Sequence, residues 1–357
     1  EEWMGASPIY TRRMQRALGF EGNDVVTIFK GLLLDIGAPP QFMDFRYEVT
    51  DRWHGSFTLA HCGALMDVEP MGEDYVRSMC HDIEDPTFDA TAVATNPRAQ
   101  IRPVHRPPRM PADRTPHCEW TVIIDPSYPE VHPTPECIEL QRSRAATIEL
   151  APIDPADEGR SAYDGPLASD FDFSSFSHSA LVRMADEVVL QMQLLSMSFI
   201  GALRRRGDAA VVRTIATKQL TGIAGVAARR VSAALGLGDG RADVIRMLSL
   251  HPMLGPEPYV VARTSADSIS VARSPAHEDD GWLGFLGPDS VRPLQAAVRA
   301  LDPHWDVEVS GEDDAWTATV VRRDAPAPEL DEVAVTSFST GTAFVFEPRR
   351  SLPITPI

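Results

Sequence analysis

The stretch that decides the fold reads Phe45-Arg46-Tyr47-Glu48-Val49 and, a few residues later, Ser56-Phe57-Thr58-Leu59. Its β-branched and aromatic residues predict two short β-strands. A comparable strand pair lies much later in the chain, at residues 259–263 and at Ser268-Ile269-Ser270-Val271. Two strand pairs of one kind suggest that the chain contains a single structural unit twice.

The segments around these strand pairs recur in the same order. A short amphipathic helix is predicted at residues 25–32 before the first pair and at residues 243–248 before the second, and helices follow from Gly72 and from Gly287. Two further blocks match: Asp85-Pro86-Thr87-Phe88-Asp89 with Asp302-Pro303-His304-Trp305-Asp306, and Glu119-Trp120-Thr121-Val122-Ile123 with Ala315-Trp316-Thr317-Ala318-Thr319. Each block is weak alone, but together they predict an internal duplication of an α+β unit.

A long helical part separates the two copies. Apolar residues keep helical spacing from Leu181 to Leu203, and Gly207-Asp208 then breaks and re-caps the chain. The second helix, residues 209–235, is rich in Ala and Gly, which predicts close packing of an antiparallel helical hairpin. Because the first helix is apolar nearly all round, we expect it to pack centrally or across a homodimer interface.

The predicted fold class is therefore α+β, with two related units joined by a Pro/Gly-rich linker and an α-helical hairpin. The first unit covers residues 1–150, the linker 151–175, the hairpin 176–235 and the second unit 236–357. Residues 333–346, with a Ser339-Thr340-Gly341 turn, are predicted to form a C-terminal β-hairpin.

Composition excludes several classes of function. The 357 residues carry 33 Lys and Arg against 51 Asp and Glu, a net charge of -18, which argues against binding to nucleic acid or to an anionic membrane. No apolar run is long enough to span a bilayer, and four cysteines without a CxxC pair favour a reduced, cytoplasmic protein. The phosphate-binding glycine motifs, GxSxG and HExxH are absent, which disfavours nucleotide cofactors and ordinary serine hydrolases.

Cysteine and histidine pairs distinguish the two copies. The first copy has His61-Cys62, Cys80-His81 and His117-Cys118, whereas the matching places of the second have Arg273-Ser274, Gln295-Ala296 and Asp314-Ala315. One hypothesis is a site for zinc or another divalent metal, with these ligands: Cys62, Cys80, Cys118, His61 and His117. A second is a nucleophilic thiol at Cys80, served by a histidine base. A third is that the cysteines are ordinary core residues.

Charged residues surround this set. Arg98, Arg102, Arg106 and Arg109 form a basic run in an acidic chain, and Arg102 or Arg106 could hold the carboxylate of a small anionic ligand. Ion pairs with the protein's own acids are the alternative. Acidic residues flank the same set and are candidates for a general base or for plain surface: Asp67, Glu69, Asp82, Glu84, Asp85 and Asp89. His178 and His251 are interpreted as structural.

The order of these motifs resembles a known family. His61-Cys62, a helix reaching Cys80, Asn96-Pro97 and then Cys118-Glu119-Trp120 before an apolar strand look like the L-2-amino-thiazoline-4-carboxylic acid hydrolase-like family, and like the wider vinyl-reductase-type small-molecule-binding domains. The resemblance covers about residues 14–125.

It implies a hydrolase that opens a C–N or C–S bond of a small anionic cyclic compound. Cys80, His81 and Cys62 would be catalytic, with Arg102 and Arg106 binding the substrate. The alternative function is a non-catalytic small-molecule-binding or assembly subunit of a larger complex. The second copy, which lacks the cysteines, favours that alternative because it shows the fold without such a site.

Overall fold

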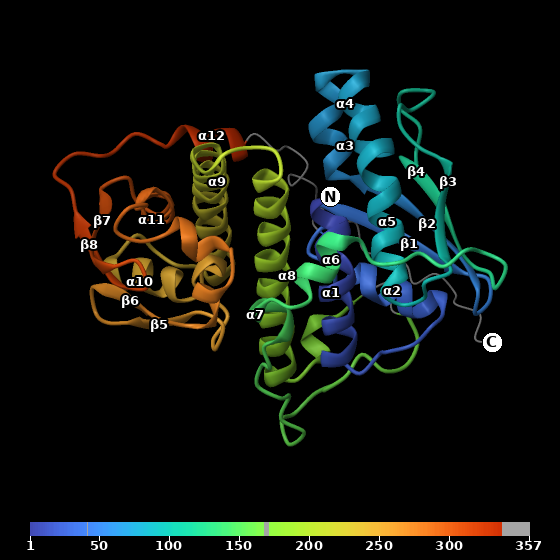
Figure 1. Ribbon diagram of the computed structural model, residues 1–357, viewed down its shortest axis with the longest axis horizontal. Coiled ribbons are helices and arrows are strands. Elements are labelled where there is room, and N and C mark those ends of the chain that lie inside the picture. The colour runs from blue at the N-terminus through green and yellow to red at the C-terminus, as the bar shows by residue number, and fades with distance from the viewer. Residues whose placement is uncertain (41, 168–170, 338–357) are drawn as a thin grey trace. The chain divides into compact units, whose positions relative to one another are not determined.

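The computed structural model describes residues 1–40, 42–167 and 171–337, which form two compact units (Figure 1). The N-terminal unit comprises Trp3–Ile138 and Ala151–Gln191. The C-terminal unit comprises Glu139–Leu150 and residues 192–337, together with Glu1 and Glu2. Helices combine with two antiparallel sheets, so the predicted α+β class is confirmed. Among the described helices, none has the length and apolar character needed to cross a bilayer.

The N-terminal unit is built on a four-stranded antiparallel sheet with the strand order β1-β2-β4-β3. Its strands are β1 (Met43–Val49), β2 (His54–Cys62), β3 (Ala99–His105) and β4 (Cys118–Ile124). Its helical segments are α1 (Glu2–Ala17), α2 (Val25–Leu33), α3 (Gly63–Val68), η1 (Glu69–Met71), α4 (Glu73–Arg77), the π-helical turn η2 (Ser78–Ile83), α5 (Glu84–Val93), α6 (Pro135–Leu140), η3 (Phe173–Ser175) and the first part of α8 (His178–Arg204).

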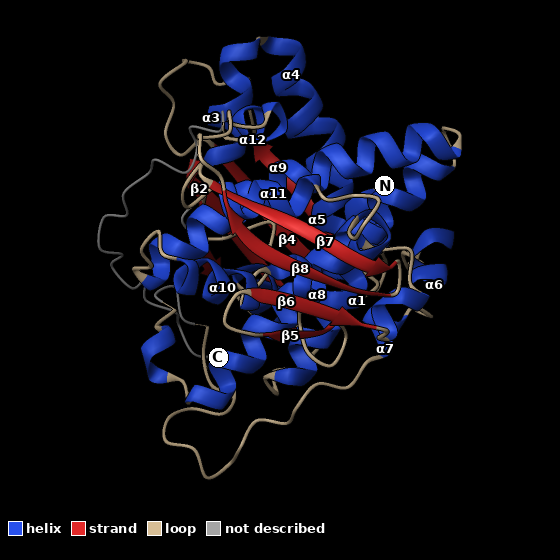
Figure 2. Ribbon diagram, turned by 90° about the vertical axis from the view of Figure 1, so that its left-hand side faces the viewer, coloured by secondary structure: helices blue, strands red, loops and turns tan. Residues whose placement is uncertain are grey.

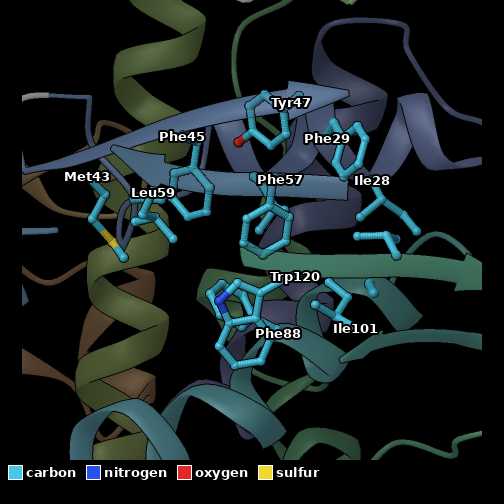
Figure 3. Packing of buried hydrophobic residues seen from close by; sticks show 14 of the residues in the cluster. Ile28, Phe29, Met43, Phe45, Tyr47, Phe57, Leu59, Phe88, Ile101 and Trp120 are labelled. Carbon is cyan, nitrogen blue, oxygen red and sulfur yellow. The ribbon is translucent and has the colours of Figure 1, made fainter. Parts of the chain in front are cut away.

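One face of this sheet carries the core (Figure 3). Alternate residues of the strands point to the same side, so Phe45, Phe57 and Trp120 gather over one surface. Helices α2 and α5 cover it with Phe29 and Phe88, and the Phe88 and Trp120 rings lie edge to face with centroids 4.9 Å apart. The core therefore joins β2 and β4, whose ends carry Cys62 and Cys118, to α5, which follows the turn that carries Cys80.

The C-terminal unit repeats this plan. Its sheet has the antiparallel order β5-β6-β8-β7, visible strand by strand in Figure 2. Its strands are β5 (Val261–Thr264), β6 (Ser268–Ala272), β7 (Trp305–Glu312) and β8 (Ala315–Arg322). Its helical segments are α7 (Arg144–Thr147), the rest of α8, α9 (Ala209–Leu235), α10 (Arg241–Ser249), η4 (Pro252–Leu254), η5 (Pro275–Glu278), η6 (Trp282–Phe285), α11 (Arg292–Arg299) and α12 (Asp331–Thr336). The shared strand order confirms two similar units.

Two of the matched sequence blocks are not equivalent in detail. Residues 85–89 lie inside α5, whereas Asp302 precedes β7 and Asp306 lies within it, so the Asp-Pro blocks occupy different elements. The strand pairing also differs, because Phe57 lies opposite Trp120 while Val271, two positions beyond the residue aligned with Phe57, lies opposite Trp316. Five-residue similarities are too short to determine conformation, which the surrounding packing decides.

The long helical part breaks where the sequence predicted. Asp208 caps α9 by accepting hydrogen bonds from the Ala210 and Val211 amides, each at 3.0 Å, and Gly236 ends the helix with a φ of 62°. The small residues of α9 approach a different partner from the one predicted. A Cβ on Gly222 would lie 2.8 Å from the Glu332 carbonyl oxygen of α12, so α12, and not α8, occupies the glycine face.

Two boundary predictions are wrong. The supposed linker packs into the N-terminal unit: Tyr163 is fully buried, and Lys30 donates hydrogen bonds to the carbonyl oxygens of Tyr163 at 2.8 Å and Gly165 at 2.7 Å. Residues 139–150, expected in the first unit, belong to the C-terminal unit, where Asp279 accepts from the backbone of α7. These boundaries depend on which side chains find buried contacts, and composition does not encode that.

The predicted C-terminal β-hairpin is also wrong at its start. Residues 331–336 form helix α12, with Val333 buried in the core. The Ser339-Thr340-Gly341 turn and the second predicted strand lie outside the described residues. Alternating apolar residues over so short a stretch do not distinguish a strand from one helical turn that buries a single valine.

Candidate functional site

Three cysteines meet at one end of the N-terminal core. Cys62 ends β2, Cys118 begins β4, and Cys80 lies in the π-helical turn η2 that leads into α5. All three belong to the same hydrophobic cluster, with exposures of 3% for Cys62, 1% for Cys80 and 2% for Cys118. The prediction that these side chains share one neighbourhood is confirmed.

The three thiols stay protonated at neutral pH, because their pKa values are raised. Burial raises the pKa of Cys62 to about 12 and raises the pKa values of Cys80 and Cys118 further above their ordinary value. The negative charge of Glu84, when ionised, adds to the rise in all three pKa values. A nucleophilic cysteine needs a lowered pKa, so the electrostatics oppose the predicted catalytic roles of Cys80 and Cys62.

The predicted metal ligands are not assembled. Among the residues that the structure describes, no three His, Cys, Asp or Glu side chains form a group that could hold a metal ion. The His61 and His117 rings lie 6.1 Å apart between centroids, and the predicted ligands Cys62, Cys80 and Cys118 sit in apolar packing. Zinc requires donors at about 2.0–2.3 Å in a tetrahedron, a geometry that these positions do not supply.

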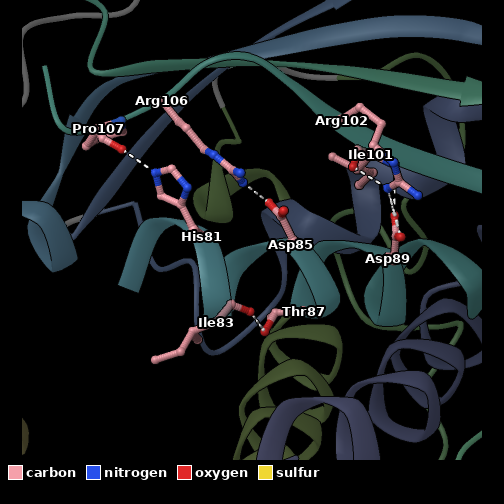
Figure 4. A network of polar contacts seen from close by, with 9 residues as sticks. All are labelled: His81, Ile83, Asp85, Thr87, Asp89, Ile101, Arg102, Arg106 and Pro107. Carbon is pink, nitrogen blue, oxygen red and sulfur yellow. Dashed lines mark hydrogen bonds and ion pairs between the residues drawn. The ribbon is translucent and has the colours of Figure 1, made fainter. Parts of the chain in front are cut away.

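His81 serves the backbone instead of Cys80. Its Nε2 donates a 2.7 Å hydrogen bond to the Pro107 carbonyl oxygen, since a carbonyl can only accept (Figure 4). This bond ties the η2 turn to the loop that follows β3. A ring held this way is directed toward the loop backbone, and the catalytic role of His81 stays a prediction.

The basic run pairs with the protein's own carboxylates. On α5, Asp85 pairs with Arg106 and Asp89 pairs with Arg102 at 2.8 Å (Figure 4). The other two arginines behave likewise: Arg98 meets Glu130 at 3.0 Å and Arg109 meets Glu69 at 2.6 Å. Of the two interpretations of this run, the structure therefore supports internal ion pairs. Those of Arg102, Arg106 and Arg109 fasten β3 and the loop after it to α5 and η1.

The sequence did not single out Glu84, the most unusual residue of the site. Glu84 is the first residue of α5, one helical turn after Cys80, and its exposure is 8%. Its Oε2 atom has no hydrogen-bond partner within the described chain. Burial is the main cause that raises its pKa to about 8, and Asp85 adds to the rise while Arg106 opposes it. At neutral pH Glu84 is therefore a neutral carboxylic acid and a hydrogen-bond donor.

We call Cys62, Cys80, Glu84 and Cys118 the thiol–carboxyl cluster. His117, the residue before Cys118, also has a buried polar atom, because its Nδ1 has no hydrogen-bond partner in the described residues. Its ring neighbour is His61. Burial lowers the pKa of His117 to about 4, so its ring is neutral. The only sequence signal for Glu84 is its spacing of four residues from Cys80, which places both side chains on one helical face.

Comparison with known proteins adds no assignment. No protein-family model, no curated protein and no solved structure matches this chain. The resemblance to the hydrolase-like family therefore remains a hypothesis based on the quoted motifs.

Proposed function

We propose that this chain is a non-catalytic small-molecule-binding protein whose N-terminal unit holds a small, neutral, mostly apolar ligand at the thiol–carboxyl cluster. The observation that carries the proposal is the buried Oε2 of Glu84, which has no protein partner among the described residues. An unsatisfied buried polar atom costs about 1–3 kcal/mol. Other buried side-chain atoms of the described chain share this state, among them Nε1 of Trp282 and Trp316, but the charge of Glu84 acts on all three thiols. A ligand atom that accepts from Glu84 would remove this cost.

The chemistry around Glu84 indicates the type of ligand. The cluster contains protonated thiols and a neutral carboxylic acid. Such groups suit a carbonyl or ether oxygen on an apolar body, since they bring no compensating positive charge. The anionic ligand expected from Arg102 and Arg106 would have to displace Asp89 or Asp85 from those arginines, which makes a carboxylate the less favourable guest.

A hydrolase is the second candidate, and one observation favours it. A carboxylic acid with a pKa near 8 is protonated at neutral pH, as a general acid must be. In this version Glu84 would give its proton to the departing nitrogen or sulfur while water attacks, and Cys80 would line the site without forming a covalent bond.

The homodimer predicted from α8 stays a prediction that light scattering can test.

Ligand-observed NMR with two matched sets of fragments, neutral amides and the corresponding carboxylates, tests the binding proposal. We expect amides to bind the wild-type protein, to lose binding in Glu84→Leu, and to be unaffected in the control Asp74→Asn, a substitution on the exposed face of α4. Preferential binding of the carboxylates, or unchanged amide binding by Glu84→Leu, would contradict it.

Incubation with 2-amino-thiazoline-4-carboxylate tests the hydrolase. Mass spectrometry that detects the addition of one water in the wild type, but not in Glu84→Gln, would favour catalysis over simple binding.

A further inference from the structure

The C-terminal unit contains a cavity of its own. Its volume is about 420 Å³, within the range of roughly 300–1,000 Å³ that is typical of small-molecule sites. It lies between the start of α9 and the segment that runs from η5 into η6. Its walls combine apolar residues, glycines and four charged side chains, of which Arg213, Val212, Gly284 and Phe285 matter most here.

Three of the four charged side chains already have partners. Asp279 accepts from the Arg144 amide at 2.9 Å, the Ala145 amide at 2.8 Å and the Tyr259 hydroxyl at 3.0 Å. Asp280 pairs with Arg204. Arg213 is different, because within the described residues it makes no ion pair or side-chain hydrogen bond. The cavity therefore presents one exposed guanidinium without a direct ion-pair partner in the described chain, and Asp279, whose hydrogen bonds come only from neutral donors, lies on the same lining.

The remaining wall is apolar. Val212 and Phe285 line the cavity, and each exposes only a small part of its side chain, 5% and 6% respectively. Gly284 contributes no side chain, and a Cβ built on it would meet no atom within 4 Å. The lining thus combines apolar side chains with the Arg213 cation.

We propose that this cavity binds a small amphipathic carboxylate, one with an aromatic or branched hydrocarbon body. The carboxylate would pair with the planar fork of Arg213, and the hydrocarbon would cover Val212 and Phe285. This site is independent of the thiol–carboxyl cluster, because its lining residues all belong to the C-terminal unit. The second copy of the duplicated unit would then bind an anionic ligand, whereas the N-terminal unit is proposed to bind a neutral one.

Isothermal titration calorimetry with benzoate, phenylacetate and their neutral amides tests the proposal on the full chain. We expect at least one carboxylate to bind the wild type about ten-fold more tightly than its amide, and this advantage to vanish in Arg213→Gln. Gly284→Leu, which places a side chain in the open space at this position, should abolish binding of both forms. The control Arg230→Gln removes an exposed arginine from the same helix outside the cavity and should change nothing.

Three results would overturn the proposal: neither carboxylate binds the wild type, Arg213→Gln retains the preference for carboxylate, or Gly284→Leu binds as the wild type does. Thermal unfolding of each variant shows whether it is folded. If Gly284→Leu unfolds, Gly284→Ala replaces it as the variant that narrows the space.

Discussion

Glu84→Gln should stabilise this protein at neutral pH. The native carboxyl holds its proton up to a pKa of about 8, whereas in the unfolded chain its ordinary value is 4.5. Folding at neutral pH therefore requires Glu84 to take up a proton that the unfolded chain has released. Glutamine has nearly the same shape and carries no charge in either state, so it removes this requirement.

The size of the effect follows from the two pKa values. Each pH unit between 4.5 and neutrality is worth about 1.4 kcal/mol, so at pH 7 the variant should be more stable by about 3 kcal/mol. The sign is that of an acid whose native pKa is raised: between 4.5 and 8 the native state binds more protons, and wild-type stability falls as the pH rises. Below this window the two proteins should be alike, and above it their difference should level off.

Urea denaturation of wild type and variant at about pH 5.5 and about pH 7.5 measures the effect, with fits that allow each unit its own transition. Other groups titrate over this range, but they are common to both proteins and cancel in the difference. Asp74→Asn, an exposed change of the same kind, is the control and should show no pH-dependent difference. A variant no more stable than wild type at the higher pH, or a difference that does not grow with pH, would refute the neutral buried state of Glu84.

Three further predictions concern other parts of the fold. In the native protein at about pH 7.5, Cys62, Cys80 and Cys118 should not react with a disulfide reagent, because burial keeps their pKa values high. All three should react once urea unfolds the chain. One thiol that reacts fast in the native state would indicate a nucleophile. His251→Leu should lower the free energy of unfolding by about 2 kcal/mol, since it leaves the Ala224 carbonyl without its 3.0 Å hydrogen bond from Nε2. The wild type should lose stability as the pH falls from 6.5 toward 4, because the unfolded chain then protonates His251 before the native state does, and the variant should lack this loss. Equal acid sensitivity of both proteins in urea titrations would contradict this. Gly222→Ala should destabilise the C-terminal unit by about 1–3 kcal/mol, because its Cβ would press on the Glu332 carbonyl. The control Gly201→Ala on α8 should be neutral or stabilising, because its Cβ would meet only the end of Arg205 at 3.6 Å. Equal melting temperatures of the two variants would show that α12 does not pack where the structure places it.

The sequence predicts the local conformation correctly where neighbouring residues decide it. The break between α8 and α9 could be predicted because Asp208 and its own following amides form the cap. The duplication could be predicted because strand and helix blocks recur in order, and the two sheets do share one strand order. The meeting of the three cysteines could also be predicted, since they lie at the ends of elements that the repeat places together.

What only the tertiary structure decided is the state of each side chain at the site. In the sequence, Glu84 was one of six similar acids and Arg106 a candidate for binding substrate. Folding buries the first in an apolar cluster, which raises its pKa, and brings Asp85 to the second, which neutralises it. Burial and charge pairing are properties of contacts between distant segments, so they follow from how α5 packs against β3 and the loop beyond it. For the same physical reason the Asp-Pro blocks, identical in pattern, became a helix in one unit and a strand entry in the other.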